Sequence, residues 1–303
     1  MPAPIIAPVP ATTFPDERRL SHKIASRLAA KLPRDRRDEI RFRLQRNAYR
    51  SWVAARIRNE LDPPLDAPIP PVEVILETSG IADTDAAVRA RPSVYLTTAY
   101  SGAHITLRAA ELAGVNIRTI GAMLDLGCGG GRYLRVWREM HGIRLVGADI
   151  NPRQIEWAGS NLPGIEFVAT EPDPPLPFAD KSFDLVSAAS VFTHIPLNGQ
   201  EPWLEEVHRV LRPGGVLVAT LAGRGHTRIQ LGEDRLASEG AVELGPDDAG
   251  VSHASVVTRQ LDIFQTRAEV VRVFGGASLE LADYIPSPYA LDVIVLRRPT
   301  TAS

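Results

Sequence analysis

A run of four glycines in five positions, Gly127–Gly131, has the residue types of a ligand-binding loop. It follows the apolar segment Ala122–Leu126, which we expect to be a buried strand, and a helix is predicted over Arg132–Met140. Glycine adopts positive φ and lets a ligand approach the backbone closely. The first turn of a helix adds unpaired N–H groups. The pattern therefore favours a loop that holds a ligand over a simple strand-to-helix turn.

Two residues beside this loop bear on the charge of the ligand. A dinucleotide fingerprint requires glycine at its first, third and sixth positions, and the sixth position counted from Gly127 is Arg132. Asp125, near the end of the strand, would repel a pyrophosphate and would favour a cation. S-adenosylmethionine carries an ammonium and a sulfonium and no phosphate. These residues predict S-adenosylmethionine as the cofactor, with a nicotinamide dinucleotide as the less favoured alternative.

A second carboxylate, Asp149, stands near the end of the next predicted strand, Arg144–Ile150. An acid about 20 residues beyond a glycine loop can accept hydrogen bonds from both hydroxyls of a ribose. The competing interpretation is that Asp149 caps the helix that begins at Pro152. We favour the ribose role because the glycine loop precedes it.

The elements that position these residues alternate between strand and helix. Such alternation predicts an α/β fold with a mainly parallel sheet covered by helices on both faces, and ligands bind such sheets at the carboxyl ends of the strands. The predicted strands are 122–126, 144–150, 165–169, 183–188, 216–221, 279–284 and 291–297, and the helices between them are 132–140, 152–160 and 201–211.

The whole chain is predicted to have three parts, two of them upstream of this region. Residues 1–15 are proline-rich and are expected to be a flexible tail, residues 16–115 a helical N-terminal cap with a proline-rich linker near 62–71, and residues 116–299 the catalytic domain. Between Glu17 and Arg58 there are 14 Lys and Arg against 4 Asp and Glu. We favour a solvated helix face that pairs with the acidic remainder of the chain over an anionic partner such as RNA or a membrane.

The composition of the 303 residues excludes several classes of protein. The formal net charge of -2 gives no overall attraction to nucleic acid, and the single cysteine, Cys128, has neither a disulfide partner nor metal-ligand spacing. We see no secretory signal and no bilayer-spanning apolar stretch, so we predict a cytoplasmic protein without a metal site. A nucleic-acid substrate is disfavoured, and the sequence does not indicate the oligomeric state.

Five blocks, in order, resemble the class I S-adenosylmethionine-dependent methyltransferases. More loosely, the chain resembles a bacterial subgroup associated with glycan pathways. The resemblance implies a Rossmann-like seven-stranded sheet and activity on a small molecule or glycan. The blocks are Leu124–Gly131, Val146–Ile150, Leu176–Val186, Ser190–Ile195 and Val210–Leu217.

The resemblance also implies roles for individual residues. Asp125, Gly127, Gly129 and Gly131 would hold the methionine part of the cofactor, and Ser190 would lie beside it. Asp149 would bind the ribose and Ile150 would pack on the adenine. Thr170 and Glu171 would lie near the adenine amino group, with an ordinary polar loop as the alternative.

Methyl transfer to a hydroxyl requires the removal of a proton, and His194 is the candidate base. It follows the fourth predicted strand, where the mouth of the site is expected. The alternative is that His194 only hydrogen-bonds the loop. The predicted function is methyl transfer to a hydroxyl or similar nucleophile; an inactive cofactor-binding protein of the same fold and a nicotinamide-dependent oxidoreductase are the alternatives.

Overall fold

The computed structural model describes residues 68–71, 74–75, 92–140, 142–223, 233–245, 261–276, 278–287 and 291–300. The chain divides between Pro64 and Leu65 into two units, and all the described residues belong to the second. The predicted tail 1–15, the basic helices of 17–60 and most of the proline-rich linker lie outside the described residues. The division into a cap 16–115 and a catalytic domain 116–299 therefore stays a prediction.

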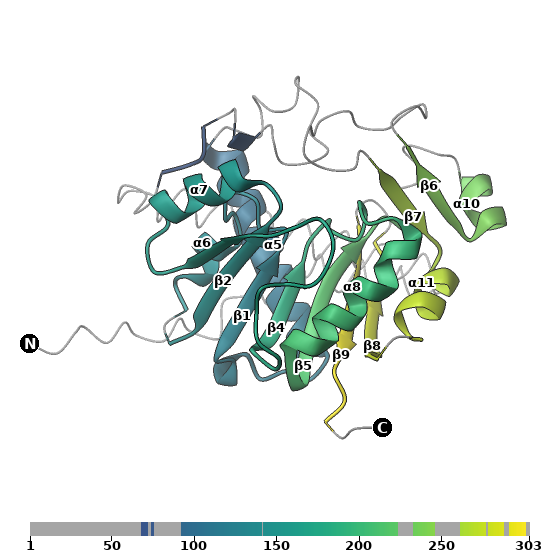
Figure 1. Ribbon diagram of the computed structural model, residues 1–303. Helices are drawn as coiled ribbons and strands as arrows, with labels where there is room; N and C mark the ends of the chain where they lie inside the picture. The colour runs from purple at the N-terminus through teal and green to yellow at the C-terminus, as the bar shows by residue number, and fades with distance from the viewer. Residues whose placement is uncertain are drawn as a thin grey trace, which may run out of the picture. The chain divides into compact units, whose positions relative to one another are not determined.

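One seven-stranded sheet forms the centre of the described unit (Figure 1). Its order is β3-β2-β1-β4-β5-β9-β8, and β9 alone runs antiparallel to both of its neighbours. The predicted Rossmann-like, mainly parallel sheet is confirmed. The strands are β1 (Ala122–Leu126), β2 (Arg144–Asp149), β3 (Glu166–Ala169), β4 (Phe183–Ala188), β5 (Leu211–Leu221), β8 (Glu280–Ile285) and β9 (Asp292–Arg297).

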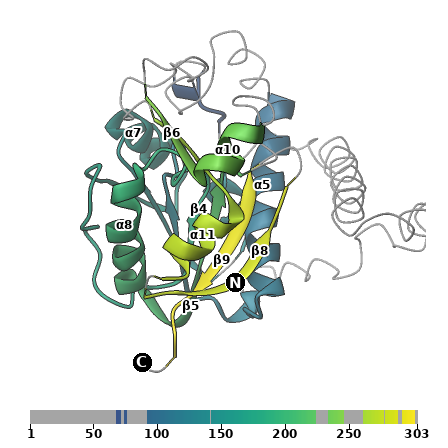
Figure 2. The same cartoon turned by 90° about the vertical axis from the view of Figure 1, so that its right-hand side faces the viewer.

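Helices cover both faces of this sheet because its central strands are apolar on both sides. On one face α8 (Leu197–Val210) and α11 (Arg267–Phe274) pack against the side chains of alternate strand residues such as Leu124. The opposite face is covered by α5 (Pro92–Leu112), α6 (Leu134–Trp137) and α7 (Pro152–Asn161), with Met123 among the residues beneath them. Figure 2 shows α5 and α8 on opposite sides of the sheet.

Helix α5 (Pro92–Leu112) falls within the predicted cap, yet it packs directly on the sheet with Ala103 and Ala109 in the same core as Val218 and Val295. It also covers the short helix α6 (Leu134–Trp137), whose Trp137 donates from Nε1 to the Ala103 carbonyl at 3.2 Å. Helix α5 is therefore part of the structure that supports the glycine loop.

A two-stranded antiparallel sheet of β6 (Ala241–Leu244) and β7 (Asp262–Gln265) stands beside the carboxyl end of β5, with α10 (Glu233–Glu239) next to it (Figure 1). The Gln265 amide donates to the Ala222 carbonyl at 3.0 Å and joins this pair to the chain just after β5. The sequence did not predict it, because four-residue strands far apart in the chain leave too little periodicity to detect.

Several boundaries differ from those predicted. The helix expected over 132–140 has only four α-helical residues flanked by turns, and the helix expected over 201–211 begins at Leu197. Strand β5 begins at Leu211 instead of Val216, because Leu211 already pairs with Phe183 before the irregular Arg212–Gly215 step. Within the described residues, no helix is long and apolar enough to cross a membrane.

Candidate functional site

The glycine loop joins β1 to α6 at the carboxyl edge of the sheet. Gly127, Gly129 and Gly131 have φ values of 69°, 53° and 73°, which place all three in the left-handed region that disfavours other residues. The loop therefore needs glycine at alternate positions for its backbone path, as the sequence predicted.

The amides of this loop point toward the end of β2. The N–H groups of Gly127 and Cys128 donate to the Ala148 carbonyl at 2.8 and 3.1 Å, and the Gly129 N–H donates to Asp149 Oδ2 at 2.7 Å. Gly131 donates back to the Cys128 carbonyl at 3.0 Å. A pyrophosphate-binding loop must turn such donors toward its ligand, whereas these four are already engaged within the protein.

Close packing is a second reason why some of these positions require glycine. A Cβ at Gly131 would lie 2.6 Å from Leu162 Cδ1, and one at Gly127 would lie 2.5 Å from Val191 Cγ2. On β2, a Cβ at Gly147 would lie 2.7 Å from Leu134 Cδ1. The close approach of α6 to the sheet is therefore permitted by a glycine on the neighbouring strand and does not need one at position 132.

Asp125 is a buried carboxylate on the α5 face of the sheet, opposite Ser187 in the pairing of β1 with β4. Burial raises the pKa of Asp125 to about 7, and the charge of Asp149 adds to the rise. Ser187 and Arg132 lower this pKa, but by less than burial raises it. A cation beside it would favour the ionised form. The ammonium of S-adenosylmethionine fits this environment and a phosphate does not.

Asp149 ends β2 and accepts from two backbone amides, Gly129 at Oδ2 and Asn151 at Oδ1 (2.9 Å). Burial raises its pKa although these bonds lower it. Each carboxylate oxygen has a second lone pair that a ribose hydroxyl can use. The helix cap is supplied by a different residue: Asn151 Oδ1 accepts from the Arg153 and Gln154 amides at the start of α7 (Pro152–Asn161).

The remaining predicted cofactor residues lie at the same edge of the sheet. Ile150 is half-buried directly after β2, and the Thr170 amide donates to the Asp149 carbonyl at 3.0 Å. Glu171 is exposed. Ser190, after β4, has a φ of 59° and donates its amide to Thr220 Oγ1 at 2.8 Å. The fold therefore gathers these residues, while their contacts with a cofactor stay predictions.

His194 is half-buried in the loop after β4, and its ring contacts strand β7. Nδ1 lies 2.7 Å from the Leu261 carbonyl oxygen and 3.6 Å from Asp262 Oδ1. The predicted alternative, a hydrogen bond to a loop, is therefore present at Nδ1. It does not exclude the role of a base, because imidazole has a second nitrogen.

The order of the strands decides between the two candidate folds. A dinucleotide-binding sheet has the order 3-2-1-4-5-6, whereas here the antiparallel β9 lies between β5 and β8. Residues 124–219 match the methyltransferase domain family. This range contains the glycine loop, Asp149 and His194 and ends within β5.

Two curated relatives from Mycobacterium ulcerans (strain Agy99) are similar over a longer stretch. A probable phthiotriol/phenolphthiotriol dimycocerosates methyltransferase 2 is 32% identical over 162 residues, covering 52% of this chain and 50% of the relative. Phthiotriol/phenolphthiotriol dimycocerosates methyltransferase 1 is 32% identical over 157 residues, covering 50% and 49%. The chain thus spans about half the length of these relatives.

The fold also resembles that of a solved S-adenosylmethionine-dependent methyltransferase from Mesorhizobium loti. The TM-score is 0.50 at 17% identity, over 66% of this chain and 100% of that one. The matched family, the strand order and the charge around the loop agree on a methyltransferase domain that uses S-adenosylmethionine. The subgroup associated with glycans has no support from these relatives.

Three residues of the site were not predicted. Ser187 faces Asp125, Thr220 holds the Ser190 amide, and Asp262 lies beside the His194 ring. The first two are ordinary polar residues within apolar strands. Their roles depend on which strands become neighbours, and the sequence carried no separate signal for them.

Proposed function

We propose that this chain transfers a methyl group from S-adenosylmethionine to a hydroxyl or similar nucleophile of a small molecule or glycan. The observation that supports this most is the state of the glycine loop. The Gly127, Cys128 and Gly129 amides donate to residues of β2 and the Gly131 amide donates within the loop. The carboxylates Asp125 and Asp149 stand beside these engaged amides and can meet a ligand. Such a site favours a ligand with positive charge and hydroxyls over one with a pyrophosphate.

In this proposal Asp125 attracts the ammonium of the cofactor and Asp149 accepts from its ribose. Ile150 packs on the adenine, and Thr170 and Glu171 lie near the adenine amino group. When bound, the cofactor supplies a methyl group already activated by a positively charged sulfur. The protein then has to align the acceptor, exclude water and take up a proton, and we assign the last step to His194.

The acceptor is proposed at the level of chemical class. The names of the two Mycobacterium ulcerans relatives contain a triol, which is a hydroxyl-bearing acceptor. Other relatives are named for a hydroquinone, a malonyl acyl-carrier protein and a sterol. The acceptors in these names support a small-molecule acceptor for this chain. A glycan acceptor stays a prediction, and so does the cytoplasmic location.

Calorimetric titration with S-adenosylhomocysteine and with NAD tests the cofactor. We expect micromolar binding of S-adenosylhomocysteine and none of NAD. Asp149→Ala should weaken the former by about tenfold or more, since a hydrogen bond to a charged group contributes roughly 1.5–3 kcal/mol. The matched control is Asp173→Ala, which removes an exposed carboxylate after β3 and should leave the affinity unchanged. Binding of NAD alone, or of neither compound, would refute the proposal.

Transfer itself is tested by incubating the full chain with methyl-labelled cofactor and a panel of phenols, aliphatic alcohols, quinols and glycans. We expect label in a hydroxyl-bearing acceptor. Tight S-adenosylhomocysteine binding without any transfer across the panel would instead favour the inactive cofactor-binding protein.

A further inference from the structure

The imidazole of His194 is held through one nitrogen by Leu261, the residue that precedes strand β7. Nδ1 lies 2.7 Å from the Leu261 carbonyl oxygen, which can only accept a hydrogen bond, so Nδ1 carries a proton. In the neutral ring the lone pair is then on Nε2. Within the described ranges no hydrogen bond reaches Nε2. The contact with Leu261 therefore selects the nitrogen that can accept a proton.

Strand β7 is itself fixed against the loop that carries His194. The Ile263 amide donates to the Thr193 carbonyl at 2.8 Å. Thr193 precedes His194 in the chain, and Ile263 follows Asp262. The buried side-chain amides of Gln200 and Gln265 pair at 3.0 and 3.2 Å. The imidazole and its neighbours on β7 are thus held in one geometry by bonds that do not involve the ring.

Asp262 adds a negative charge on the same side of the ring. Its Oδ1 lies 3.6 Å from Nδ1, and the side chains of His194 and Asp262 are only 20% and 16% exposed. Solvent screens such a pair weakly. The carboxylate therefore favours the tautomer whose proton is on Nδ1, the nitrogen that it faces.

We propose, on the basis of the methyl transfer proposed above, that Asp262 is a positioning residue for His194. Together with the Leu261 carbonyl it keeps the proton on Nδ1, so that Nε2 can accept the proton of an acceptor hydroxyl. In that step the O–H bond breaks and an N–H bond forms at Nε2, and the oxygen keeps the electron pair that attacks the methyl carbon. The O–C bond would form as the C–S bond of the sulfonium breaks, and the sulfur would leave with that electron pair as a neutral thioether. Asp262 balances the resulting positive charge.

The matched control is Glu243, a carboxylate on β6 of the same small sheet. Its Oε2 accepts from the Leu197 amide at 3.1 Å and so ties the sheet to the start of α8, just beyond His194. Glu243→Gln disturbs the anchoring of the sheet without removing a charge from the imidazole. Asp262→Asn removes that charge and keeps the size of the side chain.

The experiment records long-range ¹H–¹⁵N spectra of the histidine rings in the full chain at a pH where the imidazole is neutral, with the His194 signals assigned by His194→Gln. We expect the Nδ1–H tautomer to dominate in the wild type and in Glu243→Gln. In Asp262→Asn the ratio of Nδ1–H to Nε2–H should fall by about fivefold, since a charged partner holds a proton more strongly than a neutral one.

An Nε2–H tautomer in the wild type, or the same ratio in Asp262→Asn as in the wild type, would overturn the proposal. Equal changes in Asp262→Asn and Glu243→Gln would assign Asp262 a structural role only and would also overturn it. S-adenosylhomocysteine affinity is measured in the same samples and should not change. Failure of the wild type to bind it would contradict the proposed function separately, whatever the tautomer.

Discussion

At the scale of single residues, the site depends on carboxylates whose burial makes their charge conditional. Asp125 is buried on β1 beside Ser187 of β4, and its pKa of about 7 means that ionising it costs free energy in the folded chain below neutral pH. A cationic ligand would offset this cost. A carboxylate whose ionisation is costly to the fold is thus one that the cofactor is expected to stabilise.

Asp125→Asn tests this through the pH dependence of stability. The folded-state pKa of Asp125 is raised above the ordinary value of 3.8. The stability that the protonated carboxyl contributes is therefore fully present below about pH 4 and is lost as the pH rises through about 7. Between these limits the wild type should lose up to about 4 kcal/mol relative to Asp125→Asn, because a tenfold change in proton affinity corresponds to about 1.4 kcal/mol. Urea denaturation at several pH values measures this loss.

The same substitution at the exposed Asp173 is the control and should retain the pH dependence of the wild type. Parallel stability curves for Asp125→Asn and the wild type between pH 4 and 7 would contradict the assignment. They would mean that the Asp125 carboxyl ionises normally in the fold.

Gly131 allows a comparison of backbone and packing requirements. Gly131 and Gly142 both have positive φ, of 73° and 82°, but a Cβ at Gly131 meets Leu162 at 2.6 Å while nothing lies within 4 Å of one at Gly142. Alanine at either position should cost about 1 kcal/mol for the backbone. Gly131→Ala should cost a further 1–3 kcal/mol or so for overpacking. Equal losses in thermal denaturation would show that packing at Gly131 is loose.

At the scale of elements, the five sequence blocks serve two different edges of the sheet. The blocks with the glycine loop, Asp149 and His194 lie at the carboxyl edge. The blocks Leu176–Val186 and Val210–Leu217 contribute contacts at the opposite edge, where Asp184 Oδ2 accepts from the Gly121 and Ala122 amides and from Arg212. Of the five blocks, three thus lie where a ligand is expected to bind, and two anchor strands at the opposite edge.

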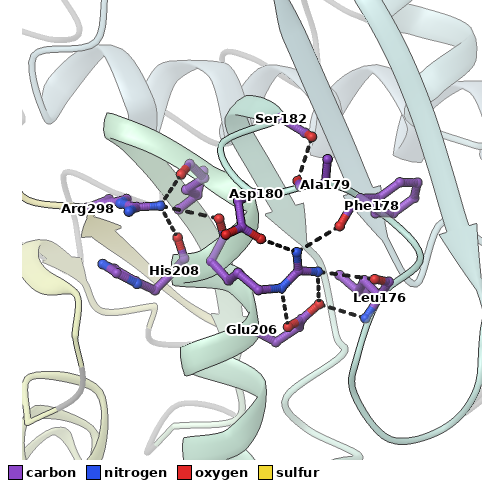
Figure 3. A network of polar contacts seen from close by, with 10 residues as sticks. Leu176, Phe178, Ala179, Asp180, Ser182, Glu206, His208 and Arg298 are labelled. Carbon is purple, nitrogen blue, oxygen red and sulfur yellow. Dashed lines mark hydrogen bonds and ion pairs between the residues drawn. The ribbon is translucent and has the colours of Figure 1, made fainter.

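Arg209 is the centre of the anchoring network at this opposite edge. Figure 3 shows Leu176, Phe178, Asp180 and Glu206, which belong to this network. Its guanidinium donates to Glu206, to Asp180 and to the carbonyls of Leu176 and Phe178, at 2.6 to 3.1 Å. Burial alone would raise the pKa of Glu206, but the bonds from Arg209 and the Leu176 amide outweigh it and the pKa is lowered. The network fastens the segment before β4 to the end of α8.

Arg209→Met should therefore destabilise the fold by about 3 kcal/mol, because it leaves the largely buried Glu206 without its partner. The control is Arg235→Met on α10, which breaks an exposed pair with Glu239 and should cost about 0.5 kcal/mol or less. Chemical denaturation compares the two. Similar losses in both variants would show that the Arg209 network is as weak as a surface pair.

At the scale of the whole described unit, the C-terminal hairpin closes the sheet next to the site. Asp292 begins β9 opposite Leu221 and accepts from Tyr284 Oη at 2.5 Å and from the Ser287 amide at 2.7 Å. Burial raises the pKa of Asp292 in spite of these bonds. One buried carboxylate thus links β8 and β9 at the end of β5.

Tyr284→Phe should cost about 1–2 kcal/mol, because it removes a donor from a buried carboxylate. Tyr100→Phe is the control, since the Tyr100 hydroxyl donates to Glu139 at 3.0 Å in an exposed position on α5. It should change the free energy of unfolding by about 0.5 kcal/mol or less. A neutral Tyr284→Phe would mean that Asp292 does not need this donor.

The sequence by itself determined the alternation of strands and helices, the glycine loop and the carboxylate that ends β2. These features are local: glycine spacing, apolar periodicity and a residue at a strand end can be read within a short window. The tertiary structure decided the antiparallel place of β9 between β5 and β8, the β6–β7 sheet, the pairing of Asp125 with Ser187 and the contact of the His194 ring with Leu261. Each depends on contacts between segments far apart in the chain, such as His194 with Leu261, which no local pattern encodes.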